Sequence, residues 1–152
     1  MSDIDIDITQ SRPLRLGVVL HDQVVWDRDS AAERIRGVDL SDIARRSARL
    51  RREHPDVDVV ADIDVVIAAE ARAARSMLNS DALQSCDGAL LYVGTPSGLV
   101  SLITDIHALG IADGAVLIPQ APGAADLICE SVLPVLDTEL QLPAVARDAR
   151  PA

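Results

Sequence analysis

The chain has 152 residues, 49% of them apolar, and a formal net charge of −10. It contains no Phe, one Trp and one Tyr, so its core must be built from aliphatic side chains and Ala. An acidic chain with so few rings lacks both the positive surface and the stacking platforms that nucleic acids need. The same charge disfavours an anionic membrane surface. We therefore expect neither a nucleic acid nor a membrane as partner.

Length and composition fit one domain, expected over residues 14–140. Residues 1–13 alternate Asp and Ile, which fits either a flexible acidic arm or an added edge strand, and residues 141–152 are expected to form a flexible tail. No basic, apolar and small-residue succession opens the chain, and no apolar run reaches the ~18 residues that span a bilayer. A cytoplasmic location is expected. Cys86 and Cys129 match no metal or redox spacing and are interpreted as buried free thiols.

Along the chain, apolar patterns predict alternating strands and helices, with residues 21–30 as a polar connection. The predicted strands are residues 14–20, 57–67, 89–93 and 114–118. The predicted helices are residues 38–52, 68–78, 95–109 and 122–136, the last with a kink at Pro134. Thr95 and Pro96 open the third helix, and Gly110 ends it as a left-handed cap residue. This alternation predicts an α/β fold with an open parallel sheet of four to five strands and flanking helices.

The strand at residues 57–67 has apolar residues at every odd position, whereas three of its even positions carry Asp58, Asp62 and Asp64. One face should therefore be pure core and the other mixed. The three carboxylates could line a polar cavity, or they could keep an open sheet edge from pairing with another chain. Because three Asp without a suitably spaced His make a poor metal site, no metal site is predicted.

The three histidines give no clear indication of a catalytic site. His21 and Asp22 follow a predicted strand and could transfer a proton, although adjacent polar residues at the start of a loop are more often simply solvated. His54 precedes a proline and is interpreted as a turn residue, and His107 lies late in a predicted helix. No Ser–His–Asp, Cys–His or HExxH arrangement occurs, so the catalytic residues are unknown.

The turn formed by Gly94, Thr95 and Pro96 presents backbone N–H groups at a helix N-terminus, which suits a phosphate. The alternative is that Thr95 only caps the helix while Gly94 makes the turn. Gln120 follows the last predicted strand and is a candidate pocket residue by position. Gly94, Thr95 and Gln120 are the candidate cofactor-binding residues.

Five pieces between residues 57 and 138 resemble, in order and spacing, the closing segment of the bacterial luciferase-like flavin monooxygenases. The resemblance is to the branch that acts on nitrilotriacetate-type and sulfur-containing substrates. The pieces are VVADIDVVI (59–67), AEARAARSMLNSDAL (69–83), YVGTP (92–96), IADGAVLI (111–118) and SVLPVL (131–136). The resemblance implies a partial (β/α) barrel and FMN or a deazaflavin as cofactor, with the possibility that the isolated chain binds none.

The chain departs from that family in two ways. A complete (β/α)₈ barrel takes about 250 residues, and the family's early strands have no counterpart here. Ser97 and Gly98 also stand where the family usually places acidic residues. The leading interpretation is a truncated flavin-dependent oxidoreductase, either residual or dependent on a partner subunit. The alternatives are a non-catalytic dimerising scaffold and a half-barrel that binds a small ligand. Because an unclosed sheet would expose an aliphatic face, we expect a homo-oligomer or a partner subunit.

Overall fold

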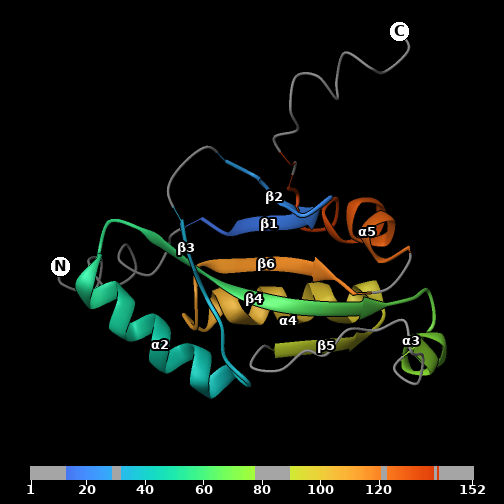
Figure 1. The fold of residues 1–152 in the computed structure, drawn as a ribbon, viewed down its shortest axis with the longest axis horizontal. Coiled ribbons are helices and arrows are strands. Elements are labelled where there is room, and N and C mark those ends of the chain that lie inside the picture. The colour runs from blue at the N-terminus through green and yellow to red at the C-terminus, as the bar shows by residue number, and fades with distance from the viewer. Residues whose placement is uncertain (1–12, 29–31, 78–89, 121–122, 139, 141–152) are drawn as a thin grey trace, which may run out of the picture.

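The computed structural model describes residues 13–28, 32–77, 90–120, 123–138 and 140, and the predicted arm and tail lie outside these ranges apart from Pro13. The fold is α/β, a mostly parallel sheet curled into a half-barrel (Figure 1). Its six strands are β1 (Arg15–Leu20), β2 (Gln23–Trp26), β3 (Ala32–Ile35), β4 (Asp58–Ile67), β5 (Leu90–Gly94) and β6 (Gly114–Pro119). Its helices are α2 (Leu40–Glu53), α3 (Ala71–Met77), α4 (Pro96–Ala108) and α5 (Ala124–Leu127), which continues as the π-helical turn η1 (Ile128–Val132).

The strands follow the order β2-β1-β6-β4-β3, and β5 pairs with the later part of β4. Five strands are parallel, while β2 runs antiparallel to β1. The predicted class is thus confirmed, and the sheet has two strands, β2 and β3, that the sequence pattern did not predict. The segment expected to be a polar connection contains β2, because His21 and Asp22 adopt φ values of 52° and 66° and close a tight hairpin turn.

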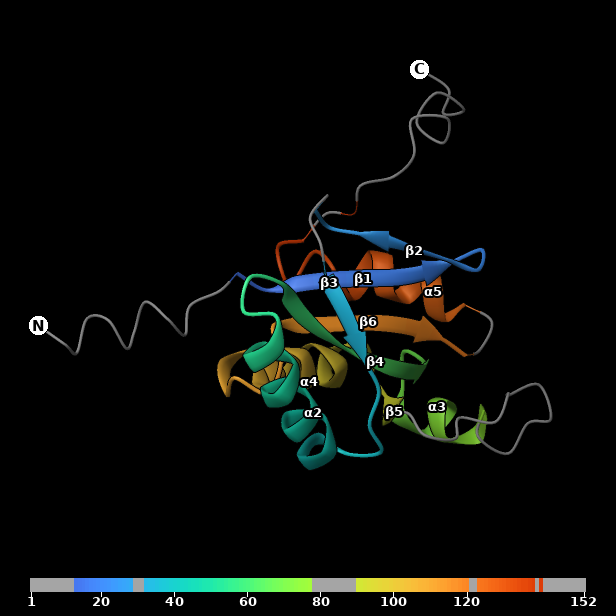
Figure 2. The same ribbon diagram turned by 60° about the vertical axis from the view of Figure 1, so that its left-hand side comes forward.

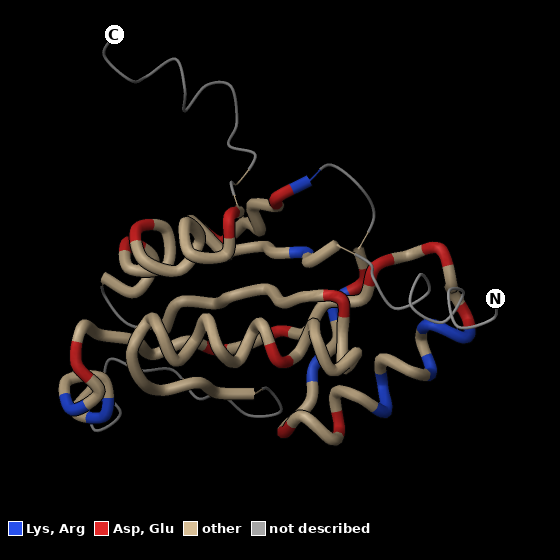
Figure 3. Tube along the Cα trace, turned by 180° about the vertical axis from the view of Figure 1, so that it is seen from behind, with Lys and Arg blue, Asp and Glu red and all other residues tan. Residues whose placement is uncertain are grey.

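One face of the sheet carries the hydrophobic core. The odd-numbered side chains of β4, among them Ile63 and Val65, are fully buried, as predicted. They pack with apolar residues of α4 and of the α5–η1 segment, which lie over this face (Figure 3). No described helix is long and apolar enough to cross a membrane.

The last helix is shorter than predicted. It begins after Gly123, whose φ is 83°, and after α5 the hydrogen bonding shifts, so that the Leu133 N–H bonds to the Ile128 carbonyl. Pro134 follows directly, and its ring nitrogen cannot donate the next bond of a regular helix. The predicted helix over residues 122–136 thus spans only residues 124–132, and the interruption predicted at Pro134 falls just after its end.

The face opposite these helices is mixed, as predicted, but it does not meet water. Asp62 and Asp64 are 4% and 3% exposed, and Val60, Val66 and Val116 are fully buried. The expected exposed aliphatic sheet face is therefore wrong within the described residues. A homo-oligomer or a partner subunit stays a prediction, but an exposed aliphatic sheet face no longer supports it. Figure 2 shows β3 crossing in front of the sheet on this side.

A buried cation joins three strands at the N-terminal end of the sheet. Arg15, at the start of β1, has no exposed surface. Its Nε donates to Asp27 at 3.0 Å, its Nη1 to Asp58 at 2.9 Å, and its Nη2 to the Arg28 carbonyl at 3.3 Å. Its guanidinium also lies 5.3 Å from the ring centroid of Trp26, within cation–π range. The contacts connect β1 with the start of β4 and with the residues that end and follow β2.

Asp113 and Gly114 complete this end of the sheet. The Asp113 carboxylate accepts from the Val59 N–H at 2.8 Å and from Arg51 of α2 at 2.9 Å. Gly114 lies against the backbone of Arg15, and a Cβ built on it would stand 1.7 Å from the Arg15 carbonyl oxygen. Any side chain at position 114 would therefore push β6 away from β1.

We expect Arg15→Met to lower the free energy of unfolding by about 3 kcal/mol, because it removes the guanidinium that holds Asp27 at 3.0 Å and Asp58 at 2.9 Å in a partly dehydrated site. The measurement is urea denaturation followed by circular dichroism. Arg28→Met is the matched control, since Arg28 is 3.9 Å from Asp58 and its side chain is 40% exposed, and it should cost less than about 1 kcal/mol. Equal losses for the two variants would contradict a central role for Arg15.

Candidate functional site

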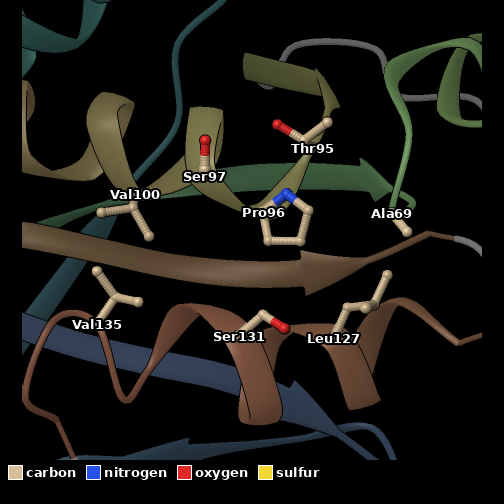
Figure 4. A pocket seen from close by; sticks show the side chains of 8 residues that line it. All are labelled: Ala69, Thr95, Pro96, Ser97, Val100, Leu127, Ser131 and Val135. Carbon is tan, nitrogen blue, oxygen red and sulfur yellow. The ribbon is translucent and has the colours of Figure 1, made fainter.

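A pocket of about 530 Å³ opens between the N-terminal end of α4 and the α5–η1 segment (Figure 4). The side chains drawn from α4 face those from α5, η1 and the turn after them across the pocket. It lies at the end of the molecule where β4 and β5 terminate, the end at which α/β proteins bind their ligands. Its walls are formed by Ala69, Thr95, Pro96, Ser97, Val100, Leu127, Ser131 and Val135. We call it the Thr95 pocket.

Thr95 is placed in this pocket by its role in starting α4. Its backbone is extended, and its hydroxyl accepts from the Gly98 N–H at 3.3 Å. Pro96 takes the first helical position, where a missing N–H costs nothing. At the other end, Gly110 has a φ of 71° and hydrogen bonds back to His107. The predicted caps of this helix are both confirmed.

Tyr92 occupies the space beside the predicted phosphate turn. Its hydroxyl donates to the Thr95 carbonyl at 2.9 Å. A Cβ built on Gly94 would lie 2.6 Å from that hydroxyl oxygen, and one built on Gly98 would lie 2.1 Å from it. The two glycines thus make room for a side chain of this chain. Burial raises the pKa of Tyr92 above its ordinary value of 10.0, although the hydrogen bonds with Thr95 oppose the shift. Tyr92 was not among the predicted site residues, and the spacing of the glycines two and six residues after it is the signal that could have indicated its position.

Gln120 does not join the other two candidate residues. Its backbone N–H bonds to the Val65 carbonyl at 2.9 Å, and its Nε2 donates to Asp64 Oδ1 at 3.0 Å. Since Asp64 occupies an even position of β4, this pair lies on the face opposite the helices. The structure therefore brings Gly94 and Thr95 together and leaves Gln120 on the other face of the sheet.

The Thr95 pocket has little electrostatic character. None of the described residues that line it is ionisable, and its polar side chains are the hydroxyls of Thr95, Ser97 and Ser131. The sequence holds neither Arg nor Lys between residues 88 and 140. The pocket can bury apolar surface and exchange a few hydrogen bonds, but none of these side chains can act as a general acid or base near neutral pH.

The histidines and the remaining aspartates that the sequence singled out lie in turns, helix ends and ion pairs. His21 and Asp22 form the exposed hairpin turn, and His54 caps α2 with its backbone N–H. Asp58 and Asp62 bind arginines. His107 lies in the last turn of α4. Across the described ranges, no three His, Cys, Asp or Glu side chains gather as a metal site.

Cys129 is exposed, so the interpretation of this thiol as buried is wrong, and Cys86 lies outside the described residues. The cysteine is on η1, where the irregular turn carries its side chain away from the core. Partial desolvation, followed by the charges of Asp126 and Glu130, raises the pKa of Cys129 above its ordinary value. The thiolate is therefore disfavoured at this position.

The fold has a counterpart among solved structures. EDTA monooxygenase (EmoA) from Chelativorans sp. BNC1, a luciferase-like flavin monooxygenase, superposes with a TM-score of 0.55 at 13% sequence identity. The match covers 82% of this chain and 44% of EmoA, so the chain spans less than half of that protein. The resemblance predicted from the sequence is confirmed at the level of the fold. No family model and no curated protein matches the sequence.

The residues at the Thr95 turn do not fit the phosphate of a flavin nucleotide. The space beside Gly94 and Gly98 holds the Tyr92 hydroxyl, and the Gly98 N–H is already bonded to Thr95. Proline removes a further donor at position 96, and no cation is found among the described residues that line the pocket. A phosphate dianion would meet neither a free cradle of N–H groups nor a compensating charge.

We expect the phenol of Tyr92, the single tyrosine of the chain, to ionise above the ordinary pKa of about 10. Its raised pKa in the folded state adds stability that is fully present below the pKa of the unfolded chain. That stability is lost as the pH rises through the folded-state pKa. The measurement is the ultraviolet absorbance of the phenolate during alkaline titration, with Tyr92→Phe as the blank. A midpoint at or below that of free tyrosine would contradict the packing described here.

Proposed function

We propose that this chain is a half-barrel that binds a small, mainly apolar ligand in the Thr95 pocket and does not catalyse a reaction by itself. The observation that carries this proposal is the composition of the pocket: apolar walls, three hydroxyl groups and no ionisable side chain among its described residues.

Position and size support binding. The pocket lies beyond the carboxyl ends of β4 and β5, and small-molecule sites usually occupy volumes of about 300–1,000 Å³ with few polar groups. Val100, Leu127 and Val135 would bury the apolar part of a ligand. The hydroxyls of Ser97 and Ser131 project from opposite sides (Figure 4) and can donate or accept, so they suit a neutral ligand that carries a carbonyl or hydroxyl group.

The described lining of the pocket holds no acid, base or cation, which argues against catalysis there. A polar pair at this end of the sheet, Asp64 and Gln120, is hydrogen-bonded within the chain and lies on the other face. The Asp64 carboxylate accepts from the Gln120 amide and is not directed at the pocket.

We expect the neutral dye Nile red, whose fluorescence rises in apolar surroundings, to bind the protein with one-to-one stoichiometry. Ser131→Leu places an apolar side chain in the pocket and should weaken dye binding by at least about tenfold, because filled volume cannot be shared with a ligand. The measurement is fluorescence titration at constant protein concentration.

Ser101→Leu is the matched control, since Ser101 is an exposed residue of α4 that does not line the pocket. It should bind the dye as the unmodified protein does. If Ser131→Leu and Ser101→Leu bind the dye equally, the Thr95 pocket is not the site.

A second candidate is one half of a flavin-dependent monooxygenase that a second chain or a second copy completes. The specific observation in its favour is the EmoA-like fold, which spans only 44% of EmoA. A completing chain could supply the cation and the opposing loops that the described residues lack. In this proposal FMN or a deazaflavin would bind only in the assembled barrel, where those loops would shield it from water.

We expect the monomeric protein to quench FMN fluorescence weakly and without stoichiometry, for want of a cation at the Thr95 turn. The titration is repeated over a range of protein concentrations, with the oligomeric state measured by sedimentation. Quenching that rises with the dimer fraction would support the second candidate. Tight quenching by the monomer, lost in Thr95→Ala and kept in the exposed-site control Thr104→Ala, would contradict the poor fit of the phosphate.

A further inference from the structure

Half of the chain's basic residues lie within one short stretch. Residues 34–53 carry seven of the 14 basic residues and only three acidic ones, in a protein whose formal net charge is −10. Most of these arginines project from α2, the helix that carries a run of basic positions in Figure 3. Such a local excess of positive charge against an acidic background creates a confined positive potential.

Four of these arginines surround a cavity of about 300 Å³ between the end of β3 and α2. Arg34 and Arg36 approach it from the β3 side, and Arg46 and Arg49 approach it from α2. Glu53 is the carboxylate at its border. We call it the arginine cavity. It shares no lining residue with the Thr95 pocket.

Among the described residues, the carboxylates around this cavity do not balance its guanidinium groups. Asp62, buried in β4, accepts from Arg34 Nε at 2.8 Å and Nη2 at 3.2 Å and also from Arg36 Nε at 3.2 Å. One carboxylate therefore serves two cations on the β3 side.

The same sharing occurs on α2. Asp42 accepts from Arg45 at 2.9 Å and from Arg46 at 3.1 Å. The hydrogen bond from Arg46 lowers the pKa of Asp42. No hydrogen bond or ion pair holds Arg49 within the described part of the chain. Among the described residues, this cluster thus has five guanidiniums, the four that line the cavity and that of Arg45, which shares Asp42. It has three carboxylates, those of Asp42, Glu53 and Asp62.

We propose that the arginine cavity binds a compact ligand that carries a phosphate group. The guanidinium fork matches phosphate oxygens in pairs, and Arg is the residue that best provides such recognition. Asp62 already holds Arg34 and Arg36 through their Nε atoms, so part of the entropy of ordering these side chains is lost before the ligand arrives. A dianion would offset the surplus of two positive charges.

The test is isothermal titration calorimetry with inorganic phosphate and, separately, with glycerol 3-phosphate, the ionic strength being held constant with sodium chloride. We expect saturable one-to-one binding of at least one of these probes. Arg36→Gln and Arg49→Gln, which change the two sides of the cavity, should each weaken it about tenfold, the effect of losing one charge-assisted hydrogen bond. Thermal unfolding of each variant checks that it is folded.

Arg52→Gln is the matched control, because it removes the same charge from the same helix at a residue outside the cavity. It should leave the affinity within about twofold of the original. An equal loss for Arg49→Gln and Arg52→Gln would show a general charge effect and overturn the proposal. Binding of neither probe would also overturn it, as would binding of an oligo-aspartate peptide alone, which would indicate an acidic protein partner.

Discussion

The fold depends on the neutralisation of one buried cation. A guanidinium without contact with water is tolerated only when carboxylates and carbonyls satisfy it, and for Arg15 these come from Asp27, Asp58 and the Arg28 backbone. These partners lie after β2 and at the start of β4. The contacts of Arg15 therefore hold the end of the β1–β2 hairpin in place and fix the separation of β1 and β4. Gly114, in the strand between them, provides the close approach that this distance requires.

Charge is distributed unequally between the two ends of the sheet. At the N-terminal end, Arg15 pairs with Asp27 and Asp58 and connects strands. Asp113 pairs with Arg51 and connects the sheet to α2. Both sets of ion pairs stabilise the fold. At the C-terminal end, the described residues of the helix-side pocket offer hydroxyls and aliphatic groups, and the polar pair of Asp64 with Gln120 faces the opposite side. In barrels the C-terminal end usually carries the chemistry and the N-terminal end the stability. This half-barrel keeps the stabilising end, and the described walls of its Thr95 pocket are apolar and hydroxyl-bearing.

The sequence predicted the elements whose signals are local. The alternation in β4, the cap at Thr95 and the left-handed Gly110 each follow from a few neighbouring residues, and each is confirmed. The short strands β2 and β3 were missed because a hairpin turn made of His21 and Asp22 lacks the usual Asn-Gly signature, and because β3 is four residues long and half polar. Tertiary contacts were not predictable from local patterns. The Asp64–Gln120 pair joins positions 56 apart, and the contact of Tyr92 with two glycines requires the turn to be folded.

A luciferase-like fold does not by itself provide a flavin site, and this chain shows the physical reason. Strong phosphate binding at a helix start needs free backbone donors, and a nearby cation increases it. Here the two requirements are met in different places. The N-terminus of α4 has the geometry, but the Thr95 hydroxyl accepts from the Gly98 N–H and the Tyr92 hydroxyl fills the space beside the turn. The surplus cations of the described residues lie between β3 and α2. A ligand with a phosphate is therefore directed to the arginine cavity, and the Thr95 pocket is left to molecules that carry no charge.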